Sequence, residues 1–197
     1  FEERYSRPID RGDEEAAAKL RTIIHPLVMR RTKEEVAPEL PEKIEQEIVV
    51  PMAEEQGKLY KQMLSQVRDS VMSAVEKDGV SKAQIQILAA LTRMRQVACD
   101  PRLTDLEGEW GVGTSGKLQA LQEIVEEAVS GGHRLLIFSQ FVQMLGLIRE
   151  MLDDAGVSYE YLDGTTKDRQ ERVDRFNRDD GVSAFLISLK AGGTGLN

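Results

Sequence analysis

Apolar residues recur at helical spacing through the first half of the chain. They predict two long amphipathic helices over residues 53–77 and 81–98, which we expect to form a hairpin. Before them, KIEQEIVV (residues 43–50) alternates enough to predict a strand that ends at Pro51. The two helical stripes, which we expect to pack on each other and on the neighbouring domain, are Leu59, Met63, Val67, Val71 and Val75, then Ile85, Leu88, Leu91 and Met94.

Residues 1–45 have a different character. They are highly charged and carry four prolines, with one helical stretch, EEAAAKLRTII, between them. A segment of this kind predicts a connector rather than a domain core.

The second half alternates between strand and helix patterns. A helix is predicted over residues 115–129, followed by the strands RLLIF (134–138), VSYEYL (157–162) and AFLIS (184–188). The helices between these strands are an amphipathic segment that ends at Gly156 and a second over residues 166–179. Strands that alternate with helices of this length predict an α/β fold with a parallel sheet covered on both faces.

The stretch GVGTSGKL, residues 111–118, matches seven of the eight positions of a phosphate-binding P-loop. The eighth should be a Ser or Thr whose hydroxyl holds Mg²⁺, but the chain has Leu118 there. The preceding TDLEGEW is polar and acidic, whereas a P-loop follows a buried strand. The pattern favours a helix start, with Ser115 or Thr114 as the N-cap.

Composition narrows the classes of function. The chain has 197 residues, 41% of them hydrophobic, and one cysteine, which forbids an internal disulfide and fits a cytosolic protein. No apolar run is long enough to span a membrane. His25 and His133 have no ligand cluster near them, so neither a zinc site nor a Ser-His-Asp triad is predicted. The net charge of −8 argues against a globally basic nucleic-acid surface but leaves room for a local one.

Candidate chemistry lies directly after the three strands, because ligands of open parallel sheets gather at the carboxyl ends of the strands. These segments are SQF (139–141), DGTTKDRQ (163–170) and LKAGGTGLN (189–197). Their hydroxyls, amides and cations suit phosphate oxygens. In the last segment, Gly192, Gly193 and Gly195 could bring bare backbone amides against a phosphate. The alternative is a plain tight turn after a strand.

The helix predicted over 166–179 is rich in arginine. Asp168 with Arg172, Glu171 with Arg175 and Asp174 with Arg178 are spaced as i,i+4 ion pairs, which predicts a solvated face. Lys167 and Arg169, nearest the strand ends, are therefore the better phosphate candidates. A second basic run, Arg30, Arg31 and Lys33, could likewise either bind phosphates or form a solvated surface.

Six motifs occur together in an order that resembles the Swi/Snf family of ATP-dependent DNA translocases, within helicase superfamily two. The resemblance covers essentially the whole chain and is far more specific than any one motif. The motifs are PLVMRRTKEEVAPELPEK, RMRQVACDPRL, SGKL, LLIFSQF, YLDGTTKDRQERVDRFN and FLISLKAGGTGLN.

The resemblance implies an inter-lobe connector at 1–45, a strand plus helical protrusion at 46–110 and an incomplete C-terminal RecA-like lobe, with a P-loop NTPase-like three-layer fold, at 111–197. It implies that Gly192, Gly193 and Gly195 lie by the nucleotide cleft. The residues that it implies contact the DNA backbone are Ser139, Gln140, Lys167, Arg169, Lys190 and Thr194.

The resemblance also implies partners and cofactors. The intact motor would use ATP and Mg²⁺, and its two lobes would grip double-stranded DNA. The chain stops inside the family's fifth motif and lacks the first lobe, so we expect it to be a piece of a larger motor that hydrolyses no ATP alone. Its location would be cytoplasmic, at the nucleoid in a bacterium or in the nucleus of a eukaryote.

Two alternatives stay open. One is a motor that acts on a protein machine such as RNA polymerase, and the other is a degenerate lobe that serves as a protein-interaction module. Exposed Met or Leu on the hairpin would favour docking, whereas the charged stretches EEQGKLYK and EKD indicate a solvated protrusion.

Overall fold

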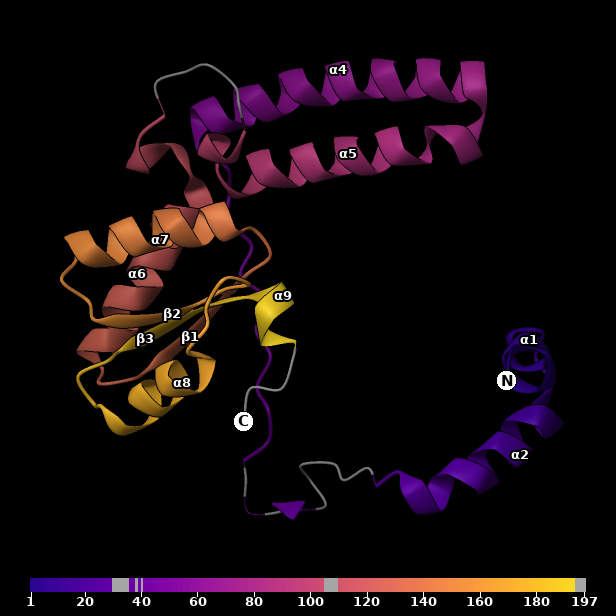
Figure 1. Ribbon diagram of the computed structural model, residues 1–197. Helices are drawn as coiled ribbons and strands as arrows, with labels where there is room; N and C mark the ends of the chain where they lie inside the picture. The colour runs from indigo at the N-terminus through magenta and orange to yellow at the C-terminus, as the bar shows by residue number, and fades with distance from the viewer. Residues whose placement is uncertain (30–35, 38, 40, 105–109, 194–197) are drawn as a thin grey trace. The chain divides into compact units, whose positions relative to one another are not determined.

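The computed structural model describes residues 1–29, 36, 37, 39, 41–104 and 110–193 (Figure 1). They belong to two compact units, Phe1–Glu47 and Ile48–Asn197. The first contains a π-helical turn (η1, Glu2–Ser6), the helices α1 (Arg7–Asp10) and α2 (Glu14–Ile24), and a 3-10 turn (η2, His25–Leu27). Asp13 caps α2, because its carboxylate accepts a hydrogen bond from the Ala16 backbone N–H at 3.0 Å. The helix predicted from EEAAAKLRTII is therefore confirmed.

The second unit begins with the predicted helical hairpin, formed by α4 (Glu54–Asp78) and α5 (Val80–Cys99). Gly79 joins the helices at a φ of 76°, a conformation that residues with a side chain rarely adopt. Met63 of α4 packs with Met94 and Val97 of α5 in a small core. Both helices end within two residues of the predicted boundaries.

The packing face predicted for α5 is correct for Met94 but wrong for its other three residues. Ile85, Leu88 and Leu91 are exposed, whereas the helix buries Ala83, Met94 and Val97. The small side chain of Ala83 belongs to the face toward α4, which leaves the larger residues on the outside. Spacing alone located the apolar residues but not the side of the helix that faces its partner.

The strand predicted over residues 43–50 is also wrong. These residues form no helix or strand, and Ile44, Ile48 and Val49 are exposed. A strand requires a neighbour that accepts its backbone hydrogen bonds, and among the described residues the only sheet is the one in the α/β lobe.

Two 3-10 turns, η3 (Pro101–Leu103) and η4 (Val112–Thr114), precede the α/β lobe. The lobe then runs α6 (Gly116–Ser130), β1 (Leu135–Ser139), α7 (Val142–Asp154), β2 (Tyr159–Leu162), α8 (Arg169–Arg178), β3 (Ala184–Ser188) and α9 (Leu189–Gly192). All strand pairs are parallel, in the order β1-β3-β2. The predicted strand AFLIS matches β3 in full, and every β3 residue is buried, as expected for a central strand.

The sheet lies between two helical layers (Figure 1). On one face, Leu118 and Val125 of α6 and Leu145 and Ile148 of α7 pack against the sheet. On the other, Phe185 and Ile187 of β3 pack with the α8 side chains Val173 and Phe176. The predicted α/β class with a covered parallel sheet is confirmed. None of the described helices is long and apolar enough to cross a membrane.

Candidate nucleic-acid and nucleotide surface at the strand ends

The parallel register brings the three predicted segments to one edge of the sheet. Ser139 at the end of β1 pairs with Ser188 at the end of β3, and Leu162 at the end of β2 pairs with Ile187. The segments after these residues therefore start side by side, as expected from the sequence.

Ser139 and Gln140 already have partners within the chain. The Ser139 hydroxyl accepts a hydrogen bond from the Phe141 N–H at 3.1 Å, which fixes the start of α7. The Gln140 side-chain oxygen accepts a hydrogen bond from the guanidinium of Arg95 on α5. The sequence did not single out Arg95, because it lies 45 residues earlier and reaches this edge only through the hairpin.

Asp163 organises the turn after β2. Its carboxylate accepts hydrogen bonds from the Thr165 hydroxyl at 2.7 Å, the Thr165 N–H at 2.8 Å and the Tyr161 hydroxyl at 2.9 Å. These donors, the Thr165 hydroxyl first, lower the pKa of Asp163 to about 2. Burial and the Asp163 carboxylate raise the pKa of Tyr161 to about 12. The Asp-Gly-Thr-Thr sequence is typical of such a side-chain-stabilised turn and could have identified it.

Lys167 and Arg169 follow this turn. The helix α8 starts at Arg169 rather than at residue 166 as predicted, so Lys167 precedes the helix. The Asp163 N–H donates a hydrogen bond to the Thr166 hydroxyl. Residues up to Thr166 therefore belong to the Asp163 turn, and α8 begins after it. Lys167 is exposed, and the Arg169 Nε donates to the Thr166 carbonyl at 3.4 Å.

The arginines of α8 pair differently from the prediction. Only Arg178 forms its expected i,i+4 ion pair, at 3.5 Å from Asp174. Arg172 and Arg175 instead lie 3.0 Å from the two carboxylate oxygens of Glu160, which is only 1% exposed. Arg172 also hydrogen-bonds this carboxylate, whereas Arg175 lacks hydrogen-bond alignment. A buried carboxylate attracts arginines more strongly than exposed acidic side chains do.

A polar depression of about 410 Å³ lies along the outer edge of β2. Arg149 of α7 forms part of its wall, with its guanidinium carbon 5.0 Å from the centre of the Tyr161 ring. Lys167 and Arg172 contribute two further cations, and Glu160 and Asp168 supply carboxylates. Because these charges have both signs and come from separate segments, no single charged run in the sequence predicted the depression.

The glycine-rich segment after β3 is not an open turn at its start. It forms the short helix α9, capped by the Ser188 hydroxyl, which accepts from the Ala191 N–H at 3.3 Å. A Cβ on Gly192 would lie 3.0 Å from the Ile187 side chain and 3.4 Å from the Phe138 ring, so a side chain at this position would require these neighbours to shift. Gly193 and Lys190 are exposed. Thr194 and Gly195 lie outside the described residues, as do Arg30, Arg31 and Lys33.

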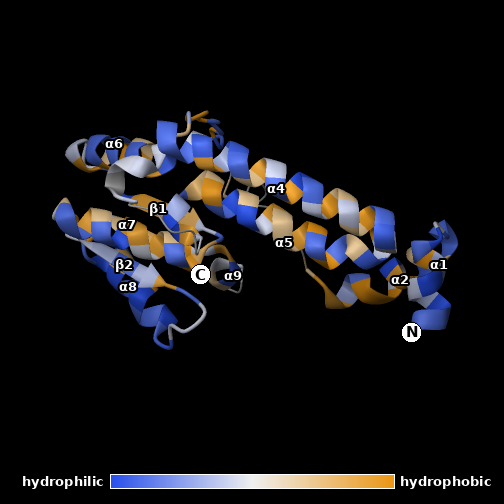
Figure 2. Cartoon of the chain, turned by 90° about the horizontal axis from the view of Figure 1, so that it is seen from above, coloured by the Kyte–Doolittle hydropathy of each residue, from blue (hydrophilic) through white to orange (hydrophobic). Residues whose placement is uncertain are grey.

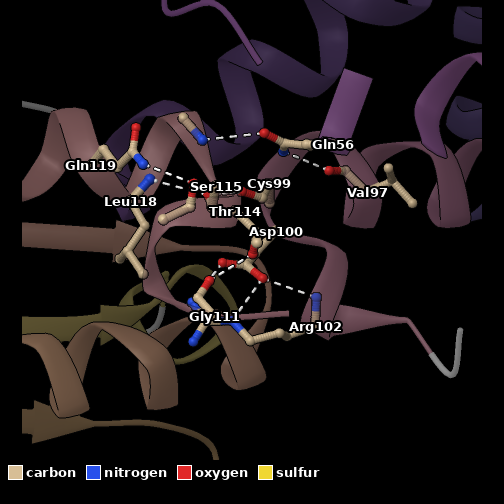
Figure 3. Close-up of polar contacts among 12 residues, drawn as sticks. Gln56, Val97, Cys99, Asp100, Arg102, Gly111, Thr114, Ser115, Leu118 and Gln119 are labelled. Carbon is tan, nitrogen blue, oxygen red and sulfur yellow. Dashed lines mark hydrogen bonds and ion pairs between the residues drawn. The ribbon is translucent and has the colours of Figure 1, made fainter. Parts of the chain in front are cut away.

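SGKL is a helix start, as predicted (Figure 3). The Ser115 hydroxyl accepts from the Leu118 N–H at 3.2 Å and donates to the Cys99 carbonyl at 2.7 Å. The fully buried Gln56 of α4 donates to the Val97 carbonyl at 2.8 Å and accepts from the Gly116 N–H at 3.2 Å. A Cβ on Gly116 would lie 2.1 Å from the Pro51 carbonyl oxygen. The absence of a side chain at Gly116 therefore allows the hairpin base and the lobe to approach closely.

Among the described residues, no group of three or more His, Cys, Asp or Glu residues could hold a metal ion. A Cβ on Gly192 would meet core side chains, and Lys117 belongs to a helix start rather than to a phosphate loop.

Comparisons with known proteins fit this fold and this order of motifs. Residues 1–103 match the SNF2-related domain, and residues 116–197 match the helicase conserved C-terminal domain. The chain belongs to the SNF2 family. Mouse chromodomain-helicase-DNA-binding protein 1-like is 34% identical over 94% of this chain and 21% of its own length. The chain thus spans about a fifth of the curated relatives that it matches.

Solved structures from Sulfolobus solfataricus resemble the chain closely. The SWI2/SNF2 ATPase core in complex with dsDNA is 30% identical, with a TM-score of 0.67, over 95% of this chain and 40% of its own. The SWI2/SNF2 ATPase C-terminal domain is also 30% identical, with a TM-score of 0.70, over 79% of this chain and 68% of its own. The RecA-like fold expected from the sequence is confirmed.

Proposed function

We propose that this chain forms the second motor lobe of an ATP-dependent translocase that moves on double-stranded DNA. The lobe would contribute DNA-backbone contacts and one wall of the ATP cleft. The observation that carries the proposal is the alignment of three polar segments at one sheet edge, in a chain of the SNF2 family. The Sulfolobus ATPase core, a structural neighbour, is described as a complex with dsDNA.

Lys167 and Lys190 are the side chains best suited to bind phosphate. Both are exposed, and each follows a strand end, after β2 and β3 respectively. Gln140 would present its amide to the backbone while Arg95 fixes its orientation. Thr194 and Gly195 keep the roles that the family resemblance implies. Contacts of this type are independent of DNA sequence and weaken with salt.

We further propose that residues 1–197 hydrolyse no ATP by themselves. Phosphoryl transfer needs a cradle for the phosphates, a metal, a positioned nucleophile and cations that stabilise the transition state. The described residues supply neither a metal-ligand cluster nor a phosphate loop. ATP and Mg²⁺ would be held mainly by the first lobe.

The test compares ATP hydrolysis by the full-length natural protein, with and without duplex DNA, with hydrolysis by residues 1–197. We expect strong stimulation by DNA in the long protein and only background hydrolysis in the short one. A long protein that ignores DNA would contradict the DNA-translocase proposal. Hydrolysis by the short chain would contradict the assignment of the ATP site to the other lobe.

A further inference from the structure

The depression along the outer edge of β2 carries more positive than negative charge. Three cations line it, Arg149, Lys167 and Arg172, together with two carboxylates, those of Glu160 and Asp168. The whole chain has the opposite balance, with 26 basic and 34 acidic residues. In Figure 2, the helix α8 beside β2 is predominantly blue, and therefore hydrophilic. A local excess of cations on an acidic protein favours the binding of anions.

Ion pairs within the lobe neutralise only part of this charge. The Glu160 carboxylate lies 3.0 Å from the guanidinium groups of both Arg172 and Arg175, so two cations share one buried anion. Within the part of the chain that the structure describes, Arg149, Lys167 and Asp168 form no ion pair. The unpaired charges of the lining are therefore two cations and one carboxylate.

Arg149 is oriented by tyrosine rather than by a carboxylate. Its Nε donates to the Tyr159 hydroxyl at 3.3 Å, and this hydroxyl donates to the Asp153 carboxylate at 3.2 Å. The guanidinium carbon also lies 5.0 Å from the centre of the Tyr161 ring. Among the described residues, these contacts use one of the five N–H donors of Arg149. The donors that remain suit the oxygens of a phosphate, which arginine binds in a bidentate manner.

The other residues of the lining also suit a phosphate. Thr165 and Thr166 belong to the turn after β2, and Lys167 precedes α8, which begins at Arg169 without a side-chain hydrogen bond from its N-cap. Hydroxyl groups, lysine and a helix N-terminus are all common partners of phosphate oxygens. No Leu, Ile, Val, Met or Phe is among the described residues that line the depression. Sites for small organic ligands are mostly apolar, so this lining favours a charged, extended ligand.

Lys167 connects the depression with the strand-end edge. It lines the depression, and it is also one of the two lysines proposed above to contact the DNA backbone. The backbone is a continuous row of phosphates, so a strand that contacts Lys167 has further phosphates on both sides of that contact. Arg149 supplies a second cation for one of them.

We propose that the depression beside β2 binds a phosphate of the DNA backbone, with Arg149 as its main contact, next to the phosphate that Lys167 contacts. This inference rests on the proposed function, because it requires DNA at the strand-end edge. It extends the proposed DNA surface along the outer edge of β2 to α7, the helix that carries Arg149. The same groups would recognise free inorganic phosphate, and the experiment separates the two sources.

The test measures duplex binding by the full-length protein, with fluorescence anisotropy across a salt series. Arg149→Gln should weaken binding to any duplex sequence and lower the slope of log K against log salt by about 0.9. Arg149→Lys should keep the slope, because a lysine still neutralises the phosphate as a point charge. Arg178→Gln is the matched control and should also keep the slope. It removes the same charge from the last turn of α8, outside the depression.

The possible failures have different signatures. A wild-type protein that binds no duplex DNA would contradict the proposed function and this inference with it. Wild-type binding with an unchanged slope in Arg149→Gln would overturn this inference alone. Calorimetric titration with inorganic phosphate in the absence of DNA identifies the other source. Heat of binding that is lost in Arg149→Gln, together with an unchanged DNA slope, would assign the depression to a free anion.

Urea unfolding separates a lost contact from a disturbed structure. Arg149 is exposed, so we expect the urea midpoint of Arg149→Gln to stay close to the wild-type value. A lower midpoint in both Arg149 variants, with a lower slope in both, would show a structural role for the residue and would contradict the proposed phosphate contact.

Discussion

The guanidinium of Arg172 on α8 lies 3.0 Å from the carboxylate of Glu160, a β2 residue that is almost completely buried. Arg175 approaches the other oxygen of the same carboxylate. One acidic residue in the middle of an edge strand thus fixes α8 on its face of the sheet. The loss of both cations would leave a buried charge without compensation.

We therefore expect Arg172→Ala with Arg175→Ala to lower the free energy of unfolding by about 2–3 kcal/mol, less than for a fully buried pair because the arginines are half exposed. Glu160→Met, which removes the charge and keeps the volume, should change it by no more than about 1 kcal/mol. Arg178→Ala is the control, because its ion pair with Asp174 is exposed. Urea unfolding checks all three, and a double variant as stable as the control would contradict the role of Glu160.

Gly116 allows the hairpin base and the lobe to approach closely. Gly116→Ala would place a Cβ 2.1 Å from the Pro51 carbonyl oxygen, and the backbone must move to relieve the clash. We expect a loss of about 2–3 kcal/mol in unfolding free energy. Gly146→Ala in α7 is the matched control, because its Cβ meets no atom within 4 Å. That variant should gain about 0.5–1 kcal/mol from its higher helix propensity. Equal effects of the two substitutions would show that the Pro51 contact is unimportant.

Asp163 gives the turn after β2 a dependence on pH. Its pKa is lowered from 3.8 to about 2, so its contribution to stability is present above pH 4 and is lost as the pH falls from about 4 to about 2. Asp163→Asn should cost about 1–2 kcal/mol at pH 7, because the Thr165 and Tyr161 donors lose a charged acceptor. The difference from the wild type should shrink across this window in unfolding experiments. The exposed Asp180→Asn is the control, and a difference that persists unchanged at pH 2 would argue against the charge effect.

Local sequence signals predicted the parts of the structure that depend on local chemistry. Ser115 was one of the two N-caps predicted before an apolar run, the other being Thr114, and AFLIS was predicted as a strand. The partners of Glu160, Gln56 and Arg95 were not predictable in this way. Each contacts a residue 12 to 60 positions away, and only the packed fold brings them together.

The errors share a physical origin. The periodicity of α5 identified the apolar positions, but the contact with α4 is decided by which side chains allow close approach, and Ala83 does so. The arginines of α8 were assigned to neighbours on their own helix, since exposed i,i+4 pairs are a local pattern. The buried carboxylate of Glu160 attracts Arg172 and Arg175 more strongly than the acidic residues of α8 do. The spacing of residues within α8 gives no sign of it, because Glu160 lies on β2. The candidate site could not be predicted from local spacing for the same reason, because the depression beside β2 combines side chains from three elements.

The exposed lysines at the strand ends provide the most direct test of DNA binding. If Lys167 and Lys190 each contact one phosphate in the full-length protein, each change to Ala should weaken binding to any duplex sequence and lower the slope of log K against log salt by about 0.9. Lys58→Ala is the control, because this lysine is paired with Glu54 and Glu55 on α4. Fluorescence anisotropy across a salt series measures both quantities. Because the phosphate contacts are electrostatic, affinity lost without a change in slope would indicate a disturbed structure rather than a lost contact. An unchanged affinity in both variants would indicate that DNA does not bind at this edge of the sheet.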